Sequence, residues 1–152
     1  MDLMKQVYHD LRRHEGCRLK VYKDSVGVWT IGYGHTKGIN ENTKPITQEQ
    51  ADAWLKDNVE EAVAIAKTIV SNYGSLSPVR KSILINMAFN LGKPRLSQFK
   101  NTLRAIENEQ WSSAAMGMLD SLWARQVGQR AQELAARMSS GTIPPHRMYK
   151  GD

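Results

Sequence analysis

The chain has 152 residues, of which 41% are hydrophobic and 24% charged, as expected for one soluble globular domain. Its single cysteine, Cys17, excludes an internal disulfide, so folding needs no oxidising compartment. No signal peptide is recognisable, and no stretch approaches the ~18–20 apolar residues of a membrane span. The net charge of +6 favours polyanionic partners but does not choose among nucleic acid, anionic lipid and an acidic cell wall.

The first predicted element is an amphipathic helix over residues 3–14. Leu3, Val7 and Leu11 are spaced by four and form one apolar stripe, with Asp2 as the N-cap. Gly16 supplies the left-handed residue that favours a helix end.

A β-hairpin is predicted next. Residues 18–23 alternate between polar and apolar, residues 24–27 (Asp-Ser-Val-Gly) have turn chemistry, and residues 28–33 are rich in β-formers. Residues 36–46 contain Gly, Asn and Pro and are predicted to form a loop, with room for a short third strand.

The rest of the chain is predicted to be helical. Thr47 and Gln50 fit a capping box that opens a helix to about residue 71, long enough either to link two lobes or to pack along one core. Further helices are expected at 79–91, ending at Gly92, then at 97–107, from 112 or 113 to 125, and at 129–138. An irregular tail containing Pro144 and Pro145 should follow.

Three residues at the helix–hairpin junction form a candidate catalytic group. Glu15 lies at a helix end, where the dipole disfavours negative charge and suits a proton donor. Asp24 lies in the turn, where backbone N–H groups favour its ionised form, and the Thr30 hydroxyl is placed to hold a water. Two carboxyls in contrasting settings are what glycosidic bond cleavage requires. Taken singly, each residue also has an ordinary structural interpretation.

The residues around this group are closely similar to those of a known family. Residues 15–24 (EGCRLKVYKD) and 29–36 (WTIGYGHT) resemble the phage-type lysozymes, glycoside hydrolase family 24. The resemblance continues through 84–92, 99–104 and 111–115 and so covers nearly the whole chain in order.

The resemblance implies a two-lobed, mainly helical α+β fold and a single domain over residues 1–152. A small antiparallel hairpin lobe would span about 15–50. A linking helix at about 47–71 would join it to a helical lobe made of about 1–14 and 72–152. The glycan of peptidoglycan would bind in the cleft between the lobes.

The resemblance also implies roles for individual residues. Glu15 would be the general acid, Asp24 the ionised partner and Thr30 the water-positioning hydroxyl. The family's substrate contacts fall on five positions: Gly34, Thr36, Phe89, Thr102 and Gly117. Thr36 and Gly117 replace a leucine and an asparagine of the best-known member.

The expected reaction is hydrolysis of the β-1,4 bond between N-acetylmuramic acid and N-acetylglucosamine. Inversion requires carboxyls roughly 6.5–9.5 Å apart, whereas a separation near ~5 Å would indicate a retaining route. Three alternatives remain open: a lytic transglycosylase, a non-catalytic peptidoglycan-binding module, and a basic nucleic-acid binder. Asp24 and Thr30 argue against the first two, and the absence of basic–aromatic interleaving argues against the third.

No cofactor or metal is expected, because the four histidines lack metal-ligand spacing. A monomer acting on peptidoglycan is expected, without nucleic acid or stable membrane insertion. It would accumulate in the host bacterial cytoplasm until a phage-encoded membrane-hole former (a holin) releases it to the periplasm and cell wall. Individual side chains are assigned to packing: Cys17 to the core, Trp29 beneath the hairpin, His35 to a structural hydrogen bond, and Trp54, Trp111 and Trp123 to core or interlobe contacts.

Overall fold

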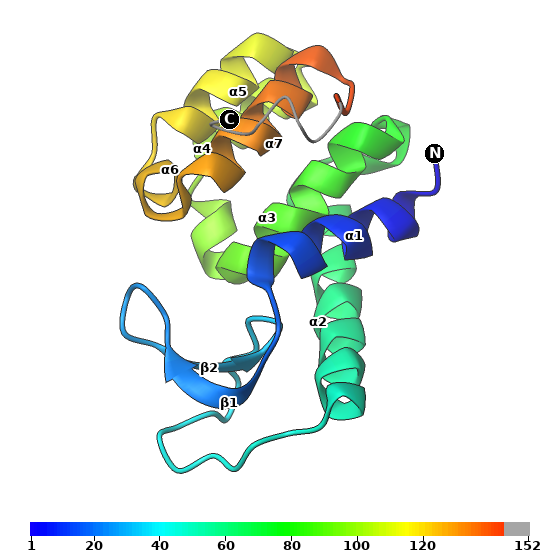
Figure 1. The fold of residues 1–152 in the computed structure, drawn as a ribbon. Coiled ribbons are helices and arrows are strands. Elements are labelled where there is room, and N and C mark those ends of the chain that lie inside the picture. The colour runs from blue at the N-terminus through cyan, green and yellow to red at the C-terminus, as the bar shows by residue number, and fades with distance from the viewer. Residues whose placement is uncertain (145–152) are drawn as a thin grey trace.

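The computed structural model describes residues 1–144. In this part of the chain, seven α-helices accompany one two-stranded antiparallel sheet (Figure 1), which confirms the mainly helical α+β fold. The elements in order are α1 (Leu3–Glu15), β1 (Arg18–Lys23), β2 (Trp29–Gly32), α2 (Gln48–Ile69), the 3-10 helix η1 (Tyr73–Ser75), α3 (Pro78–Ser97), α4 (Lys100–Glu107), α5 (Trp111–Leu119), α6 (Leu122–Val127) and α7 (Gln129–Ser140). The predicted irregular tail lies mostly outside the described residues.

The predicted helix caps flank the hairpin. The Asp2 side chain accepts a hydrogen bond from the Lys5 backbone N–H at 3.0 Å and starts α1. The Thr47 hydroxyl accepts one from the Gln50 backbone N–H at 3.1 Å and starts α2. Gly16, with φ of 65°, ends α1 as predicted. These local signals fix where the hairpin begins and where α2 leaves it.

Three helix boundaries differ from the prediction. Gly92 breaks the helical geometry with φ of 74°, but the helix resumes and α3 continues to Ser97, because Pro94 is tolerated in the first turn of the resumed segment. The next helix therefore starts at Lys100 rather than at residue 97. The single helix predicted up to residue 125 is two helices, because Ser121 caps α6 by accepting a hydrogen bond from the Ala124 N–H at 3.1 Å.

The hairpin is more exposed than the alternating pattern predicts. Tyr22 pairs with Thr30 and Arg18 with Gly32, with an irregularity in the register between them. Leu19 is 38% exposed, and Cys17 is only half-buried, with its Sγ 3.7 Å from the Gln48 side-chain oxygen. Trp29 is also only half-buried. The predictions that Cys17 packs in the core and that Trp29 is buried beneath the hairpin are wrong, because a two-stranded sheet offers no second layer to cover them. Residues 36–46 form no third strand.

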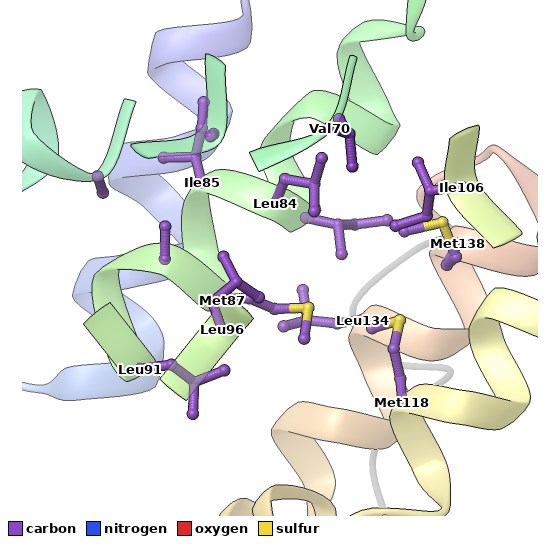
Figure 2. Close-up of a cluster of buried hydrophobic side chains, with 14 of the residues drawn as sticks. Val70, Leu84, Ile85, Met87, Leu91, Leu96, Ile106, Met118, Leu134 and Met138 are labelled. Carbon is purple, nitrogen blue, oxygen red and sulfur yellow. The ribbon is translucent and has the colours of Figure 1, made fainter. Parts of the chain in front are cut away.

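The hydrophobic core lies among the helices and is shown in part in Figure 2. Residues from α1 through α7 contribute, whereas the fully buried residue of the hairpin, Ile31, lies outside this cluster. Figure 1 shows α2 running from the hairpin region to the other helices. A Cβ atom at Gly32 would come into ordinary contact with Ile46 and Ala51, so the end of β2 lies beside the start of α2. No helix within residues 1–144 is long and apolar enough to cross a membrane.

Candidate active site

The turn of the hairpin holds the Asp24 carboxylate by its backbone, as the sequence predicts. Asp24 Oδ1 accepts hydrogen bonds from the backbone N–H groups of Val28 at 2.8 Å and Val26 at 3.0 Å. Two N–H donors stabilise the ionised form of a carboxyl group. Both bonds go to Oδ1, so Oδ2 is the oxygen available to a ligand.

Thr30 lies on β2 and is only 3% exposed. Its hydroxyl donates its one proton to the Val28 carbonyl oxygen at 2.9 Å. The hydroxyl oxygen can therefore still accept a hydrogen bond but has no second proton to give. A water held by Thr30 would have to be the donor.

Glu15 ends α1 and lies directly against Gly34. A Cβ atom at Gly34 would come within 2.4 Å of Glu15 Oε1, so the absence of a side chain at Gly34 makes room for the carboxylate. The other oxygen, Oε2, accepts a hydrogen bond from Arg130 Nη1 at 2.8 Å. Glu15 therefore forms an ion pair with Arg130 at the carboxyl end of α1.

Tyr22 lies within electrostatic reach of both carboxylates. Burial raises the pKa of its phenol, the negative charge of Glu15 raises it further, Arg18 lowers it and Asp24 again raises it. Both carboxylates therefore lie within electrostatic reach of one side chain that pairs with Thr30 across the sheet. The structure thus brings Glu15, Asp24 and Thr30 around the same part of the hairpin.

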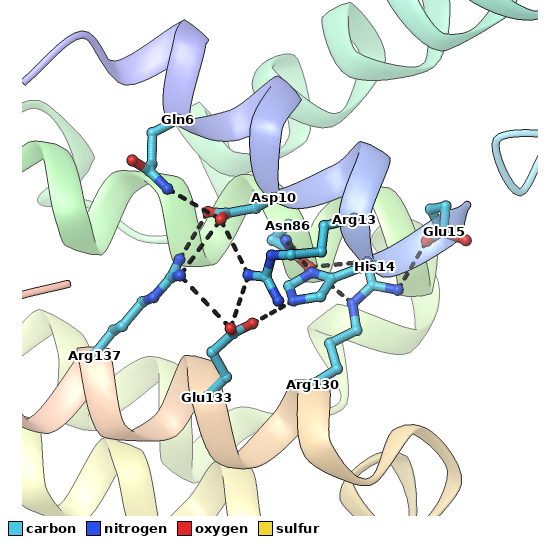
Figure 3. A network of polar contacts seen from close by, with 9 residues as sticks. All are labelled: Gln6, Asp10, Arg13, His14, Glu15, Asn86, Arg130, Glu133 and Arg137. Carbon is cyan, nitrogen blue, oxygen red and sulfur yellow. Dashed lines mark hydrogen bonds and ion pairs between the residues drawn. The ribbon is translucent and has the colours of Figure 1, made fainter. Parts of the chain in front are cut away.

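A chain of polar contacts runs behind Glu15 (Figure 3). Arg130 on α7 donates to Asn86 Oδ1 on α3 through Nε at 3.0 Å and Nη2 at 2.8 Å. Asn86 Nδ2 is 3.1 Å from His14 Nδ1, and His14 Nε2 contacts Glu133 Oε2. The Glu15 carboxylate at the end of α1 is therefore held by Arg130 of α7, which Asn86 of α3 contacts in turn.

The network continues to Arg13 and Asp10 of α1. Glu133 Oε1 forms an ion pair with Arg13 Nη2 at 2.7 Å, and Arg137 donates to Asp10 Oδ2 at 2.7 Å. Burial raises the pKa of Glu133, but the hydrogen bonds from His14 and Arg13 and the positive charge of Arg13 outweigh it and hold the value at about 2. Glu133 is thus a buried carboxylate at neutral pH.

The five predicted substrate contacts line two hollows. Gly34, Thr36 and Phe89 line one of about 190 Å³, and Thr102 and Gly117 line another of about 390 Å³. Gly92 lines the first and Leu91 the second, so the kink of α3 contributes to the walls of both hollows. A Cβ at Gly117 would lie 2.3 Å from the Thr102 hydroxyl oxygen, so this hydroxyl fills the place of a side chain at 117.

Aromatic residues support the walls of these hollows. His35 stacks on Trp54 of α2 with ring centroids 4.2 Å apart, and its Nδ1 is 2.9 Å from Asn58 Nδ2. The structural hydrogen bond predicted for His35 is therefore present. Trp123 is buried, donates to Asn90 Oδ1 at 2.6 Å and packs edge-on against Phe99. Trp111 lines neither hollow; it lies under the Arg80 guanidinium, at 3.9 Å from ring centroid to Cζ.

Comparison with known proteins decides the family. The profile described as "Phage lysozyme" matches residues 12–140, which includes Glu15, Asp24 and Thr30. The chain belongs to the phage lysozyme family. "Probable T4-type lysozyme 1" of Dictyostelium discoideum is 28% identical over 165 residues, covering 90% of this chain and 95% of that protein. The "Endolysin" of Salmonella phage P22 is 32% identical over 122 residues, covering 76% and 78%. The "Endolysin" of Acyrthosiphon pisum secondary endosymbiont phage 1 is 37% identical over 82 residues, covering 54% of each.

As a phage lysozyme, the chain is a glycosidase. The polar network behind Glu15 is the part of the site that the sequence alone did not predict. Arg130 contacts Glu15 from 115 residues away in the sequence, and Asn86 in turn contacts Arg130. No local pattern predicts either contact. One signal was available. Arg130, Glu133 and Arg137 are spaced by three and four and share a stripe of α7, where Glu133 and Arg137 are buried. Buried charges at helical spacing indicate partners on a facing helix.

In residues 1–144 of this phage lysozyme, no three side chains of His, Cys, Asp or Glu are grouped so that they could hold a metal ion.

Proposed function

We propose that this phage lysozyme is an endolysin that hydrolyses the β-1,4 bond between N-acetylmuramic acid and N-acetylglucosamine in bacterial peptidoglycan, for host cell lysis and phage release. The observation that carries the proposal is the pair of carboxylates around Tyr22, which have different partners. Glu15 contacts a guanidinium at a helix end, and Asp24 is held by two backbone N–H groups. Relatives named lysozyme and endolysin fit this activity.

Glu15 is the proton donor to the glycosidic oxygen in this mechanism. When the proton leaves, Arg130 stabilises the carboxylate that remains, which favours the transfer. Asp24 stays ionised and activates a water or stabilises positive charge on the sugar ring. Thr30 orients that water by accepting one of its protons, since its own proton is given to Val28.

The two hollows are proposed to take the sugar residues of the glycan. Gly34, Thr36 and Phe89 would contact the sugar in the hollow next to Glu15, and Thr102 and Gly117 the sugar in the larger one. Gly117 has no side chain to donate or accept, so the Thr102 hydroxyl is the polar group of this pair. Water attack on the face opposite the leaving group would invert the anomeric carbon.

Digestion of purified peptidoglycan in water enriched in oxygen-18 tests the reaction class. Hydrolysis puts one heavy oxygen at the new reducing end of N-acetylmuramic acid, which mass spectrometry detects. An anhydro product without the label would identify a lytic transglycosylase and refute the proposal, and a chain that releases no fragment would be a binding module. NMR of the first-formed anomer then tests inversion, and an initial β product would contradict it.

The Glu15→Gln variant tests the acid. Gln keeps the size of the side chain and can still accept from Arg130, so the fold should be retained while lysis of chloroform-treated cells is lost. Circular dichroism and the melting temperature check the fold, and turbidity loss measures lysis. A variant that still lyses cells at the wild-type rate would remove Glu15 from its proposed role.

The proposal extends to the organisation and setting of the protein. Residues 1–152 act as one lysozyme domain, with the hairpin lobe, the linking helix α2 and the helical lobe enclosing the glycan. The protein acts as a monomer on the cell wall, and its charge of +6 draws it to the anionic polymer. It accumulates in the host cytoplasm and depends on a holin for access to peptidoglycan. Lysis by the expressed protein with and without a co-expressed holin tests this dependence.

A further inference from the structure

The hydrogen bonds behind Glu15 can each have only one direction. Arg130 Nε and Nη2 are donors under all conditions, so the Asn86 atom that faces both must be the amide oxygen. The amide nitrogen of Asn86 then faces His14 Nδ1 at 3.1 Å and donates to it. His14 Nδ1 accepts and carries no proton, so the ring hydrogen is on Nε2 and points to Glu133.

Burial and charge agree with a neutral His14. Asn86 is 2% exposed and Glu133 is 1% exposed, so neither has ready access to water as a substitute partner. With His14 neutral, three guanidinium groups (Arg13, Arg130, Arg137) face three carboxylates (Asp10, Glu15, Glu133). A proton on Nδ1 would add a positive charge beside Arg13 and Arg130. It would also place two hydrogen-bond donors, His14 Nδ1–H and the Asn86 amide nitrogen, opposite each other.

We infer that His14 is a positioning residue for Glu15. As the neutral Nε2–H tautomer, His14 accepts a hydrogen bond from the Asn86 amide nitrogen and so fixes the orientation of the amide. The amide oxygen accepts from Nε and Nη2 of Arg130, which leaves Nη1 directed at Glu15. The inference rests on the proposed role of Glu15 as the acid. Without the acceptor at His14, the amide is free to turn, and Arg130 loses the contact that orients it.

His14 also contacts Glu133, so a purely structural role must be separated from positioning. Two substitutions at His14 each replace the function of one ring nitrogen and remove that of the other. In His14→Asn the side-chain oxygen takes the place of Nδ1, which keeps the acceptor for Asn86 and gives up Glu133. In His14→Gln the side-chain nitrogen takes the place of Nε2, which keeps a donor to Glu133 and gives up the acceptor. Positioning predicts that Asn restores activity, and a structural role through Glu133 predicts that Gln does.

The first test is nitrogen-15 NMR of the histidine side chains in the wild-type protein at neutral pH. The expected result is an unprotonated Nδ1 and a protonated Nε2 on His14, with the Glu15→Gln variant unchanged. A doubly protonated ring or the opposite tautomer overturns the inference. This measurement needs no substitution at His14, so it decides even if His14 variants do not fold.

The second test is kinetic, on soluble peptidoglycan fragments. His14→Ala should lower kcat roughly tenfold or more with little change in KM, because the acid is misplaced while sugar contacts remain. His14→Asn should recover most of the lost rate, and His14→Gln should not. Gln6→Ala is the matched control, since it removes a hydrogen bond to Asp10 at the far end of the same network and should leave kcat unchanged.

The outcomes separate the two claims. A wild-type protein that releases no labelled fragment refutes the proposed function. An active wild type whose Gln variant matches or exceeds the Asn variant overturns the inference and leaves the function standing.

Discussion

Replacing Gly34 by alanine places a methyl group where the Glu15 carboxylate lies. The new Cβ would sit 2.4 Å from Glu15 Oε1 and 2.9 Å from its Cδ, well inside ordinary contact distance. The carboxylate must move by about 1 Å, because normal packing distances are near ~3.5 Å. This movement takes it away from Arg130 Nη1, now 2.8 Å away. Gly34 also has φ of +69°, so alanine adds backbone strain.

Gly38→Ala supplies the matched control for backbone strain. Gly38 has φ of +74°, close to that of Gly34, but a Cβ there would meet nothing within 4 Å. Both variants should lose about 1–2 kcal/mol of unfolding free energy from the left-handed conformation. The collision is present only in Gly34→Ala. Comparison of the two variants therefore isolates the effect of moving Glu15.

We expect Gly34→Ala to lose roughly a hundredfold in kcat, as a misplacement of ~1 Å at a catalytic group can do. Gly38→Ala should lyse cells at the wild-type rate once the concentration of folded protein is matched. Turbidity loss of chloroform-treated cells measures activity, and urea unfolding measures stability. Equal activity of the two alanine variants would refute the reasoning, because it would mean that the contact with Gly34 does not determine where Glu15 works.

Two further predictions concern stability. Burial lowers the pKa of His14 from its ordinary 6.5, and Glu133 is held at about 2 against an ordinary 4.5. Because both pKa values are lowered by folding, each group stabilises the folded state above its ordinary pKa, and this stability is lost as pH falls. Glu133 alone accounts for about 3 kcal/mol of unfolding free energy between pH 4.5 and 2. The urea midpoint should therefore decrease from pH 7 to pH 5 to pH 3, and a constant midpoint would contradict the prediction. Gly117→Ala should lose about 1 kcal/mol in the wild type, where its Cβ meets the Thr102 hydroxyl, and gain about 1 kcal/mol beside Thr102→Ala, where helix propensity alone remains. A double-mutant cycle measures this coupling, and additive effects would rule out the collision.

The sequence predicted the features that depend on neighbouring residues. Asp2, Thr47 and Gly16 act within one helical turn, and the predicted caps and helix end were confirmed. The Asp24 turn was also predictable, because its backbone donors are only two and four residues away. The sequence predicted that the helix ends at Gly92, whereas the structure has a kink there and α3 continues to Ser97. A glycine at a helix end and a glycine at a kink give the same local sequence pattern.

Features that depend on tertiary packing were missed or mispredicted. Alternation in the first strand predicted that Cys17 is covered, but coverage depends on a second layer that two strands do not provide. Arg130 was not recognised because its partners Glu15 and Asn86 come from α1 and α3. The family resemblance named the acid but carried no information about what holds it in place here.

The link from Glu15 to α7 has a consequence for synthesis of the protein. A ribosome makes Glu15 and the whole hairpin more than a hundred residues before Arg130. Until α7 has emerged and docked, the nascent chain has Glu15 without the guanidinium that donates to its carboxylate. The contact between Glu15 and Arg130 can therefore form only after residue 130 has been made, and a chain stalled before that point would have Glu15 without this partner.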